Sequence, residues 1–342
     1  MTPNIACISY IYSSLAQAPV SNYTFKHTYS HGNNMGFFSD LSHCFFDVGI
    51  MAWDVLLTVS NLVRRKYLIG DVTPEGHPGY GRHWPEFIPP QLTDSRCSAP
   101  HSMRWPTMVS IISRSGRRVS FVELNNHVQA TYNFSPTFSF FVLHFLARML
   151  NRNFSEDTFD LEEIDLHNGI EHDASLLRLD TAFQPDQSIT HVPFIEELLA
   201  AATGKDRDGN DIITTKDCFR ILGKRRAVAR AVNKEFSLSF FHKIFGSTNA
   251  STLITIFGGR VDDLHSFLLH ERIPESWESR IRQPHEMTII NLDKTVLRVE
   301  VGRHERLQKA IVVLLLDEIL MTWDTASGFI ITVALGTYCI IR

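Results

Sequence analysis

The stretch from Ile170 to Asp180 holds the densest group of side chains that could do chemistry. It reads Ile-Glu-His-Asp-Ala-Ser-Leu-Leu-Arg-Leu-Asp, with a carboxylate, an imidazole and a hydroxyl set among apolar residues. The apolar spacing predicts a helix, in which Glu171 and Ser175 are four residues apart and share one face. Their oxygens could then converge on a hard cation, or one could hydrogen-bond the other. A surface turn with salt bridges is the alternative.

The cysteines and histidines form no metal or redox motif. The five cysteines are odd in number and scattered, without the C-x-x-C spacing of zinc or thiol redox sites. They are Cys7, Cys44, Cys97, Cys218 and Cys339. The sixteen histidines include no H-E-x-x-H helix. A disulfide scaffold is therefore not expected, and one cysteine is available for a separate role.

Two further segments look like ligand-binding loops but lack essential residues. Asp206, Asp208 and Asn210 alternate as in an EF-hand, yet the glycine comes two places early and no glutamate closes the loop. We interpret this segment as a solvated turn between helices. The segment from Gly76 to Gly81 has neither the lysine nor the preceding strand of a phosphate-binding loop.

Helical patterns dominate from residue 119 onward, and these elements must position the polar side chains. Ser120 and Glu123 match a capping box, Ser135 and Pro136 open an apolar helix, and Asp160 caps a third segment that runs to residue 180. Further helices are predicted at residues 193–202, 215–233, 239–257 and 261–270. Strand alternation is scarce between residues 119 and 271, so the sequence predicts an all-α fold.

Charge and hydropathy exclude some classes of partner. The 342-residue chain has a net charge of -4 and a pI of about 6.5, which disfavours a nucleic-acid partner. The run from Phe45 to Val63 is long and apolar enough to suggest a membrane span. However, Asp47 and Asp54 would each cost about 2.5–3.5 kcal/mol at the centre of a bilayer. We therefore expect an amphipathic or buried helix here, and no membrane association.

The two ends of the chain are expected to lie outside the main domain. The segment from Ile5 to Ala18 ends in a pattern like a signal-peptidase site but lacks a basic region before it. A secreted or endomembrane location is therefore one hypothesis. We expect an N-terminal extension with a signal or amphipathic helix (1–69), one helical domain (70–300) and an apolar C-terminal tail (301–342). The oligomeric state is not predicted.

The order of these motifs resembles that of a known family. The segment from Glu171 to Asp180 resembles the signature Glu-His-Asp-Ala-Ser-Leu-x-Arg-x-Asp of the chloroperoxidase-type haem-thiolate peroxidases, which include the peroxygenases. The flanking landmarks agree in order: Trp84-Pro85-Glu86-Phe87-Ile88-Pro89-Pro90, Asp94-Ser95-Arg96, Arg114-Ser115-Gly116-Arg117, and Tyr132-Asn133-Phe134-Ser135-Pro136. The resemblance covers residues 70–300 and implies a single helical haem-peroxidase domain.

This resemblance implies cofactors, substrates and residue roles. It implies haem b and one Mg²⁺ or Mn²⁺ as cofactors, with hydrogen peroxide and a small aromatic molecule as substrates. In the family, the positions of Glu171, Ser175 and His172 hold the ion beside a haem propionate. His172 is also similar to the histidine that assists peroxide cleavage in shorter members, so His172 and Glu171 are the expected catalytic residues. Relatives occur in fungal polyketide and mycotoxin pathways, which suggests a polyketide-derived substrate.

Two regions depart from the family pattern. Many members place a distal glutamate where Asn249 stands, and an amide cannot shuttle a proton. The proximal motif Pro-Cys-Pro-Ala-Leu-Asn-x-Leu-Ala-Asn-His-Gly belongs between Asp94 and Arg114, where it is absent. Direct alignment leaves Ala99 at the thiolate position, unless Cys97 moves in by two positions as the haem ligand.

A local shift of reading frame is a third explanation of this segment. Codons read from the third base of Ser98 permit Cys-Pro-Ala-Leu-Asn-Ala-Leu-Ala-Asn-His-Gly. With a CGN codon for Arg104, the genetic code forces the second and third alanines and the glycine of that peptide.

The rival functional hypothesis is a non-catalytic protein that keeps the helical scaffold without functional haem. Ala99 and Asn249 favour this hypothesis.

Overall fold

The computed structural model describes residues 35–87, 91, 94–97 and 115–302, and for residues 35–45 it describes the backbone alone. The chain divides into two compact units, residues 1–44 and residues 45–342. Every candidate site residue lies in the second unit. The signal-like segment and almost all of the apolar C-terminal tail lie outside the described residues.

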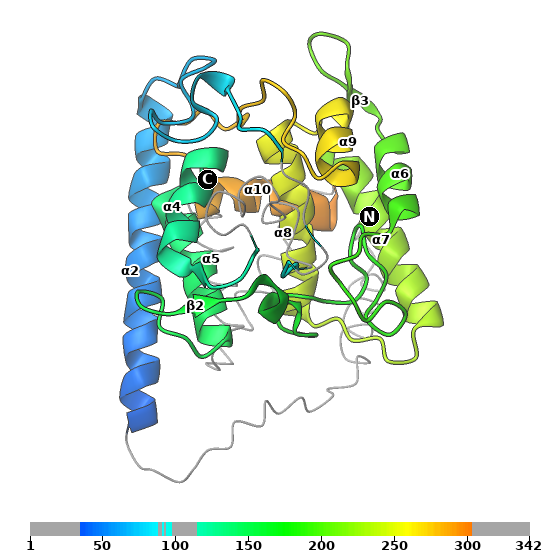
Figure 1. The fold of residues 1–342 in the computed structure, drawn as a ribbon, viewed down its shortest axis with the longest axis horizontal. Coiled ribbons are helices and arrows are strands. Elements are labelled where there is room, and N and C mark those ends of the chain that lie inside the picture. The colour runs from blue at the N-terminus through cyan, green and yellow to red at the C-terminus, as the bar shows by residue number, and fades with distance from the viewer. Residues whose placement is uncertain (1–34, 88–90, 92–93, 98–114, 303–342) are drawn as a thin grey trace, which may run out of the picture. The chain divides into compact units, whose positions relative to one another are not determined.

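Helices make up most of the described chain, which confirms the predicted all-α class (Figure 1). The α-helices are α2 (Met35–Val63), α4 (Phe121–Tyr132), α5 (Pro136–Met149), α6 (Val192–Ala200), α7 (Thr215–Val232), α8 (Phe240–Phe257), α9 (Val261–Leu269) and α10 (Ile289–Val301). Two short 3-10 helices are η1 (Tyr80–Arg82) and η2 (Leu161–Asp165). The strands form two antiparallel pairs, β1 (Val119–Ser120) with β2 (Thr158–Phe159) and β3 (Gly204–Lys205) with β4 (Asp211–Ile212).

Side-chain caps fix where the predicted helices begin. Ser120 accepts a hydrogen bond from the N–H of Glu123 at 3.4 Å at the start of α4. Ser135 accepts one from the N–H of Phe138 at 3.1 Å, and Pro136 follows it as the first residue of α5. These contacts satisfy N–H groups that have no partner within the helix. Both helices therefore begin where the sequence predicts.

The loop between β3 and β4 is the solvated turn that the sequence predicts. The carboxylate of Asp206 accepts hydrogen bonds from the N–H groups of Asp208 and Asn210, each at 2.9 Å. The side-chain amide of Asn210 donates to the same carboxylate. The loop's own donors thus occupy the oxygens that a calcium site would need.

The carboxylate of Glu300 ties three helices of the core together, α7, α8 and α10. Glu300 of α10 pairs with Arg226 of α7 and with Lys243 of α8, each at 2.9 Å. Ser247 of α8 also donates to this carboxylate. Because several donors surround it, the buried charge is compensated. This contact fixes α8, which carries one wall of the site, against α7 and α10.

Helix α2 contains the predicted helix 45–63 and turns a polar side inward. Asp54 is fully buried, and its carboxylate accepts hydrogen bonds from the N–H groups of Ile289 and Ile290 at 3.0 and 3.1 Å. These are the first two residues of α10. Thr137, at the start of α5, also donates to Asp54. One carboxylate thus caps α10 and joins three helices.

The segment between η2 and α6 is not helical, so the prediction of a helix through residue 180 is wrong. We name residues 166–191 the site loop. Ala174 has a φ of 57°, in the left-handed region that interrupts a helix. Asp180 accepts a hydrogen bond from the N–H of Ala174 at 2.8 Å. A hydrogen bond between a short polar side chain and a nearby backbone N–H competes with the backbone hydrogen bonds of a helix.

We expect Asp54→Ala to lower the free energy of unfolding by about 3 kcal/mol, because it removes a cap and leaves buried N–H groups without an acceptor. Urea unfolding followed by circular dichroism measures this loss. Asp262→Ala is the matched control, since Asp262 is exposed in the first turn of α9 and α9 has no side-chain cap. The control should lose about 0.5 kcal/mol or less. Equal losses in the two variants would contradict the capping role.

Candidate functional site

The site loop and α8 enclose a pocket that contains the residues predicted to hold a metal ion. Glu171, His172 and Ser175 line it from the site loop, while Gly246 and Asn249 line it from α8. The other lining residues are Ile170, Leu176, Leu177, Arg178 and Leu253. The structure therefore brings the three loop residues together beside Asn249, although through a turn instead of a helix.

The imidazole of His172 is buried, and its two nitrogens have different surroundings. Nδ1 lies 2.9 Å from the carbonyl oxygen of Asp173 and donates a hydrogen bond to it, which places the proton on Nδ1. Burial lowers the pKa of His172 to about 4, so the ring is neutral near pH 7. Nε2 then carries a lone pair, which makes it the atom able to accept a proton.

Helix α8 can approach this imidazole because residue 246 is glycine. A Cβ at Gly246 would lie 2.9 Å from Cε1 and 3.1 Å from Nε2 of His172. Both separations are shorter than normal van der Waals contacts. The sequence analysis did not single out Gly246. The available signal was a glycine in a helix interior, which costs about 1 kcal/mol unless packing requires it.

The carboxylate of Glu171 has one bonded and one unbonded oxygen. Oε2 accepts a hydrogen bond from Nδ1 of His167 at 2.6 Å. Oε1 is buried and has no hydrogen-bond partner within the part of the chain that the structure describes. Burial raises the pKa of Glu171, and the hydrogen bond from His167 opposes that rise. A cation at Oε1 would recover the free energy that desolvation of this oxygen costs.

Ser175 and the backbone of His172 supply two more oxygens near Glu171. The hydroxyl of Ser175 donates to the carbonyl oxygen of His172 at 3.0 Å. Octahedral Mg²⁺, with ligands at about 2.1 Å, places neighbouring oxygens about 3 Å apart. The spacing of these two oxygens fits such an ion. Across the described residues, no group of three His, Cys, Asp or Glu side chains is placed to hold a metal ion. A site here would rest on one carboxylate, one hydroxyl and one carbonyl.

Two aspartates of the motif, Asp173 and Asp180, hold the site loop in shape and do not line the pocket. Besides the N–H of Ala174, Asp180 accepts a hydrogen bond from the side-chain amide of Asn233, after α7, at 2.8 Å. Asp173 accepts one from the N–H of Ser237 at 2.8 Å. These contacts join the loop to the connection between α7 and α8. The motif therefore contains residues that hold the site loop in place as well as residues that line the pocket.

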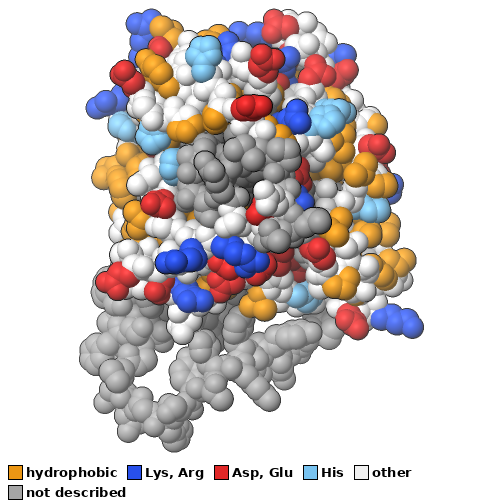
Figure 2. Space-filling view, viewed as in Figure 1, with side chains coloured by type: hydrophobic (Ala, Val, Ile, Leu, Met, Phe, Trp, Pro, Cys, Tyr) orange, Lys and Arg blue, Asp and Glu red, His pale blue; other side chains and the backbone are white. Residues whose placement is uncertain are grey.

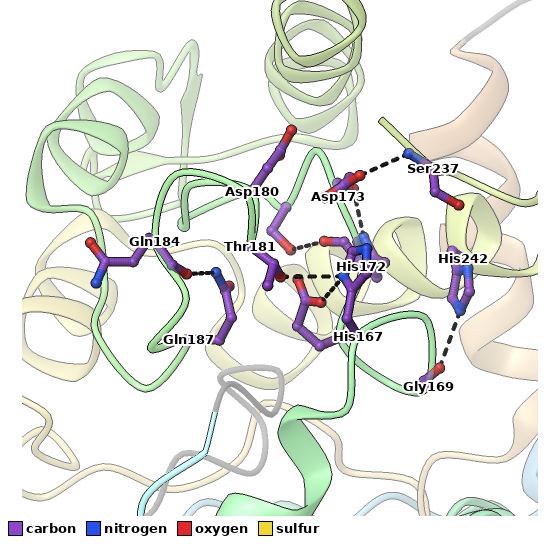
Figure 3. Close-up of polar contacts among 12 residues, drawn as sticks. His167, Gly169, His172, Asp173, Asp180, Thr181, Gln184, Gln187, Ser237 and His242 are labelled. Carbon is purple, nitrogen blue, oxygen red and sulfur yellow. Dashed lines mark hydrogen bonds and ion pairs between the residues drawn. The ribbon is translucent and has the colours of Figure 1, made fainter. Parts of the chain in front are cut away.

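His242 of α8 is a second buried histidine that the sequence analysis did not select. Its ring centroid lies 6.1 Å from that of His172, with the planes at 29°. Nε2 donates to the carbonyl oxygen of Gly169 at 3.2 Å, as Figure 3 shows, and the hydroxyl of Ser239 donates to Nδ1 at 2.9 Å. Burial lowers the pKa of His242. These contacts fasten the site loop to the first turn of α8.

Cys97, the candidate haem ligand, is buried at the base of the segment where the proximal motif is expected. It is 4% exposed and belongs to the same apolar cluster as the apolar wall of the pocket. The N–H of Ser95 donates to the carbonyl oxygen of Ser115 at 2.8 Å, which joins the chain on both sides of residues 98–114. Residues 98–114, including Ala99, lie outside the described residues, so the three explanations of this segment stay open.

Comparison with protein families supplies a match for this chain. The family described as "Peroxidase, family 2" matches residues 85–282. The matched range is more than half of the 342 residues, and it contains Cys97, the site loop and α8. No curated protein matches the chain in a sequence comparison.

Two helix-interior glycines, Gly223 of α7 and Gly246 of α8, should respond in opposite ways to alanine. Gly223→Ala should raise the free energy of unfolding by about 1 kcal/mol, because alanine favours helix and an added Cβ meets nothing within 4 Å. Gly246→Ala should lower it by about 1–3 kcal/mol and shift the NMR resonances of the His172 imidazole, because the Cβ meets that ring. Chemical denaturation measures both variants. A Gly246→Ala protein as stable as Gly223→Ala would contradict the close approach.

Proposed function

Since this chain belongs to peroxidase family 2, the chloroperoxidase family, and is a peroxidase, we propose that it works as a haem-thiolate enzyme on a small aromatic substrate. Hydrogen peroxide is the proposed oxidant, and an aromatic intermediate of secondary metabolism is the proposed substrate. One observation carries this proposal. The neutral imidazole of His172 and the unbonded oxygen of Glu171 lie on one loop and line one pocket.

The described residues offer a haem group one apolar wall and a buried cysteine. Apolar side chains from the site loop and α8 form the wall on which a flat macrocycle can pack. Cys97 is the proposed ligand, because it is buried near that apolar cluster and close to the Ser95–Ser115 pairing. Cys218 is a poor candidate, since burial within α7 raises its pKa to about 12. When bound, haem supplies the iron at which the O–O bond breaks, and a thiolate ligand favours heterolytic cleavage.

His172 is the proposed proton carrier. Its Nε2 takes a proton from one oxygen of peroxide and returns it to the other, while Nδ1 stays bonded to the carbonyl of Asp173. The pKa of about 4 makes the protonated ring a strong donor, so the return step is favourable. Burial excludes water that would otherwise compete for this proton.

Glu171 is proposed to act beside His172 by holding a Mg²⁺ or Mn²⁺ ion. The ion would lie between Oε1 of Glu171, the hydroxyl of Ser175 and the carbonyl of His172, all of which are oxygens suited to a hard cation. Because that carbonyl belongs to His172, the ion would also fix the backbone that carries the imidazole. Glu171 thus contributes to catalysis through the position of the proton carrier.

Asn249 favours one alternative function, a non-catalytic binding protein. Its side chain lines the pocket at the place where the family often has a glutamate. An amide can donate and accept hydrogen bonds but cannot carry a proton. With Asn249 in that place, proton transfer falls to His172 alone, and removal of His172 discriminates between the two functions.

We expect His172→Ala to slow peroxide-dependent oxidation by about 10²–10⁴-fold and to leave the haem spectrum intact, because one proton carrier is lost. Steady-state turnover of an aromatic substrate at saturating peroxide measures the rate. His265→Ala, which changes an exposed histidine of α9, should turn over like the unaltered protein. Unchanged turnover in His172→Ala would move the role elsewhere. An unaltered protein with full haem and no turnover would support the non-catalytic alternative.

Glu171→Gln should abolish retention of Mg²⁺ or Mn²⁺ after dialysis and reduce haem content, because it removes the one carboxylate of the proposed ion site. Elemental analysis of the dialysed protein and its haem absorbance measure the two effects. Glu162→Gln is the control, since that side chain is 55% exposed on η2. Metal content in Glu171→Gln equal to that of the control would refute the ion site.

A further inference from the structure

Residues 46–63 of α2 have the reverse of the usual side-chain arrangement of a surface helix. Four of their five polar residues, Asp47, Asp54, Thr58 and Asn61, are at most 8% exposed, and the fifth, Ser60, is half-buried. Large apolar residues point outward instead, with exposed fractions of 55% for Val48, 44% for Trp53, 69% for Leu56, 47% for Val59, 74% for Leu62 and 83% for Val63. A helix on a protein in water normally turns its apolar stripe to the core and its charges to solvent. We call the outward residues the α2 apolar face.

Buried hydrogen bonds hold the helix in this orientation. Thr58 shares a hydrogen bond of 2.7 Å with Thr288, and Asn61 donates to the carbonyl of Glu286 at 3.2 Å. The N–H of His285 donates to Asn61 at 2.8 Å, and Asp54 caps α10. Rotation of α2 to hide its apolar side would break all of these contacts. The outward position of the apolar side chains is therefore a fixed property of the fold.

The α2 apolar face is continuous and carries no charge. Between residues 46 and 63 the ionisable side chains are Asp47 and Asp54, and both are buried. On the molecular face in Figure 2, by contrast, acidic and basic side chains are interspersed with apolar ones. A large exposed apolar patch marks a surface that binds a protein partner or a membrane.

The residues that follow the helix point to a membrane partner. Arg64, Arg65 and Lys66 are exposed directly after α2. Tyr67, Leu68 and Ile69 come next and are 39%, 61% and 71% exposed. Anionic lipid head groups attract basic side chains, while Trp53 and Tyr67 are residue types that settle at the boundary between head groups and acyl chains. We propose that the α2 apolar face and this basic run bind the surface of an anionic lipid bilayer.

The helix lies along the surface in this proposal and does not cross the bilayer. The segment Phe46–Val63 is long and apolar enough to span, with a mean hydropathy of 1.4 and 33% of its residues buried. However, the carboxylate of Asp54 is bonded to α5 and α10, so a spanning helix would have to leave the core. Insertion of the outward half of α2 to the depth of the head groups needs no such change. The expectation of no membrane association rested on the cost of Asp47 and Asp54 inside a bilayer, and a helix that lies on the surface keeps both carboxylates within the protein.

Vesicle flotation of the full-length protein tests the proposal, with vesicles of phosphatidylcholine and phosphatidylserine in equal amounts compared with phosphatidylcholine alone. The protein should float with the anionic vesicles, and Arg64→Gln, Arg65→Gln, Lys66→Gln should weaken partitioning about 100-fold, since each basic residue contributes several-fold. Val59→Glu, Val63→Glu should reduce binding about as much. Val228→Glu, Val232→Glu on α7 is the matched control, because these valines are 47% and 57% exposed with the same spacing, and it should float like the unaltered protein.

Three results would overturn the proposal. The first is an unaltered protein that stays in the unbound fraction, and the second is equal vesicle binding by the α2 and α7 glutamate pairs. The third is an unaltered protein that forms a dimer in light scattering and binds no vesicles, while Val59→Glu, Val63→Glu is a monomer. That result would assign the α2 apolar face to a second copy of the chain. Circular dichroism confirms that each variant is folded, as expected for substitutions at exposed positions.

Discussion

The carboxylate of Asp180 is the contact on which the candidate site depends. It joins the N–H of Ala174, in the middle of the site loop, to the side chain of Asn233 after α7. Ala174 is buried and has a left-handed backbone conformation, so its N–H takes no part in a helix or a sheet and needs another acceptor. Since Ala174 lies between His172 and Ser175, this one acceptor determines where both of those residues lie.

Burial of the site loop then determines its chemistry. Desolvation lowers the pKa of His172 and raises that of Glu171, so each group is pushed toward its neutral form. In the proposed function the neutral form of His172 is the useful one, because a proton carrier must first accept a proton. The folded pKa of about 4 lies below the ordinary value of 6.5, so protonation favours the unfolded chain as pH falls through that range. For Glu171, the hydrogen bond from His167 compensates one oxygen and leaves the other for the proposed cation.

The sequence predicted best what depends on local contacts. Ser120 and Ser135 act within one turn of their own helices, so their caps could be read from short spacings. The site loop was assigned to a helix because its apolar spacing is helical, whereas Asp180 and Asp173 hold it through contacts with Asn233 and Ser237 that are distant in sequence. Glu171 and Ser175 were selected from their spacing, His172 was added by the family resemblance, and all three line one pocket.

Long-range contacts explain what the sequence did not predict. The helix α10 was not expected, and beside its N-cap Thr288 its first two N–H groups are bonded to Asp54, which lies 235 residues before Ile289 in the chain. Gly246 and His242 matter only because α8 packs on the site loop. The composition of α2 is that of a buried helix, yet only the packed structure reveals which side faces outward.

The absorption spectrum of the reduced carbon monoxide complex of the haem-loaded protein tests most directly whether Cys97 is the haem ligand. We expect the long-wavelength Soret band of thiolate ligation in the unaltered protein and in Cys218→Ser, and its loss in Cys97→Ser. A thiolate band that persists in Cys97→Ser, or that appears only when residues 98–114 are replaced by the shifted-frame peptide, would contradict Cys97 as the ligand.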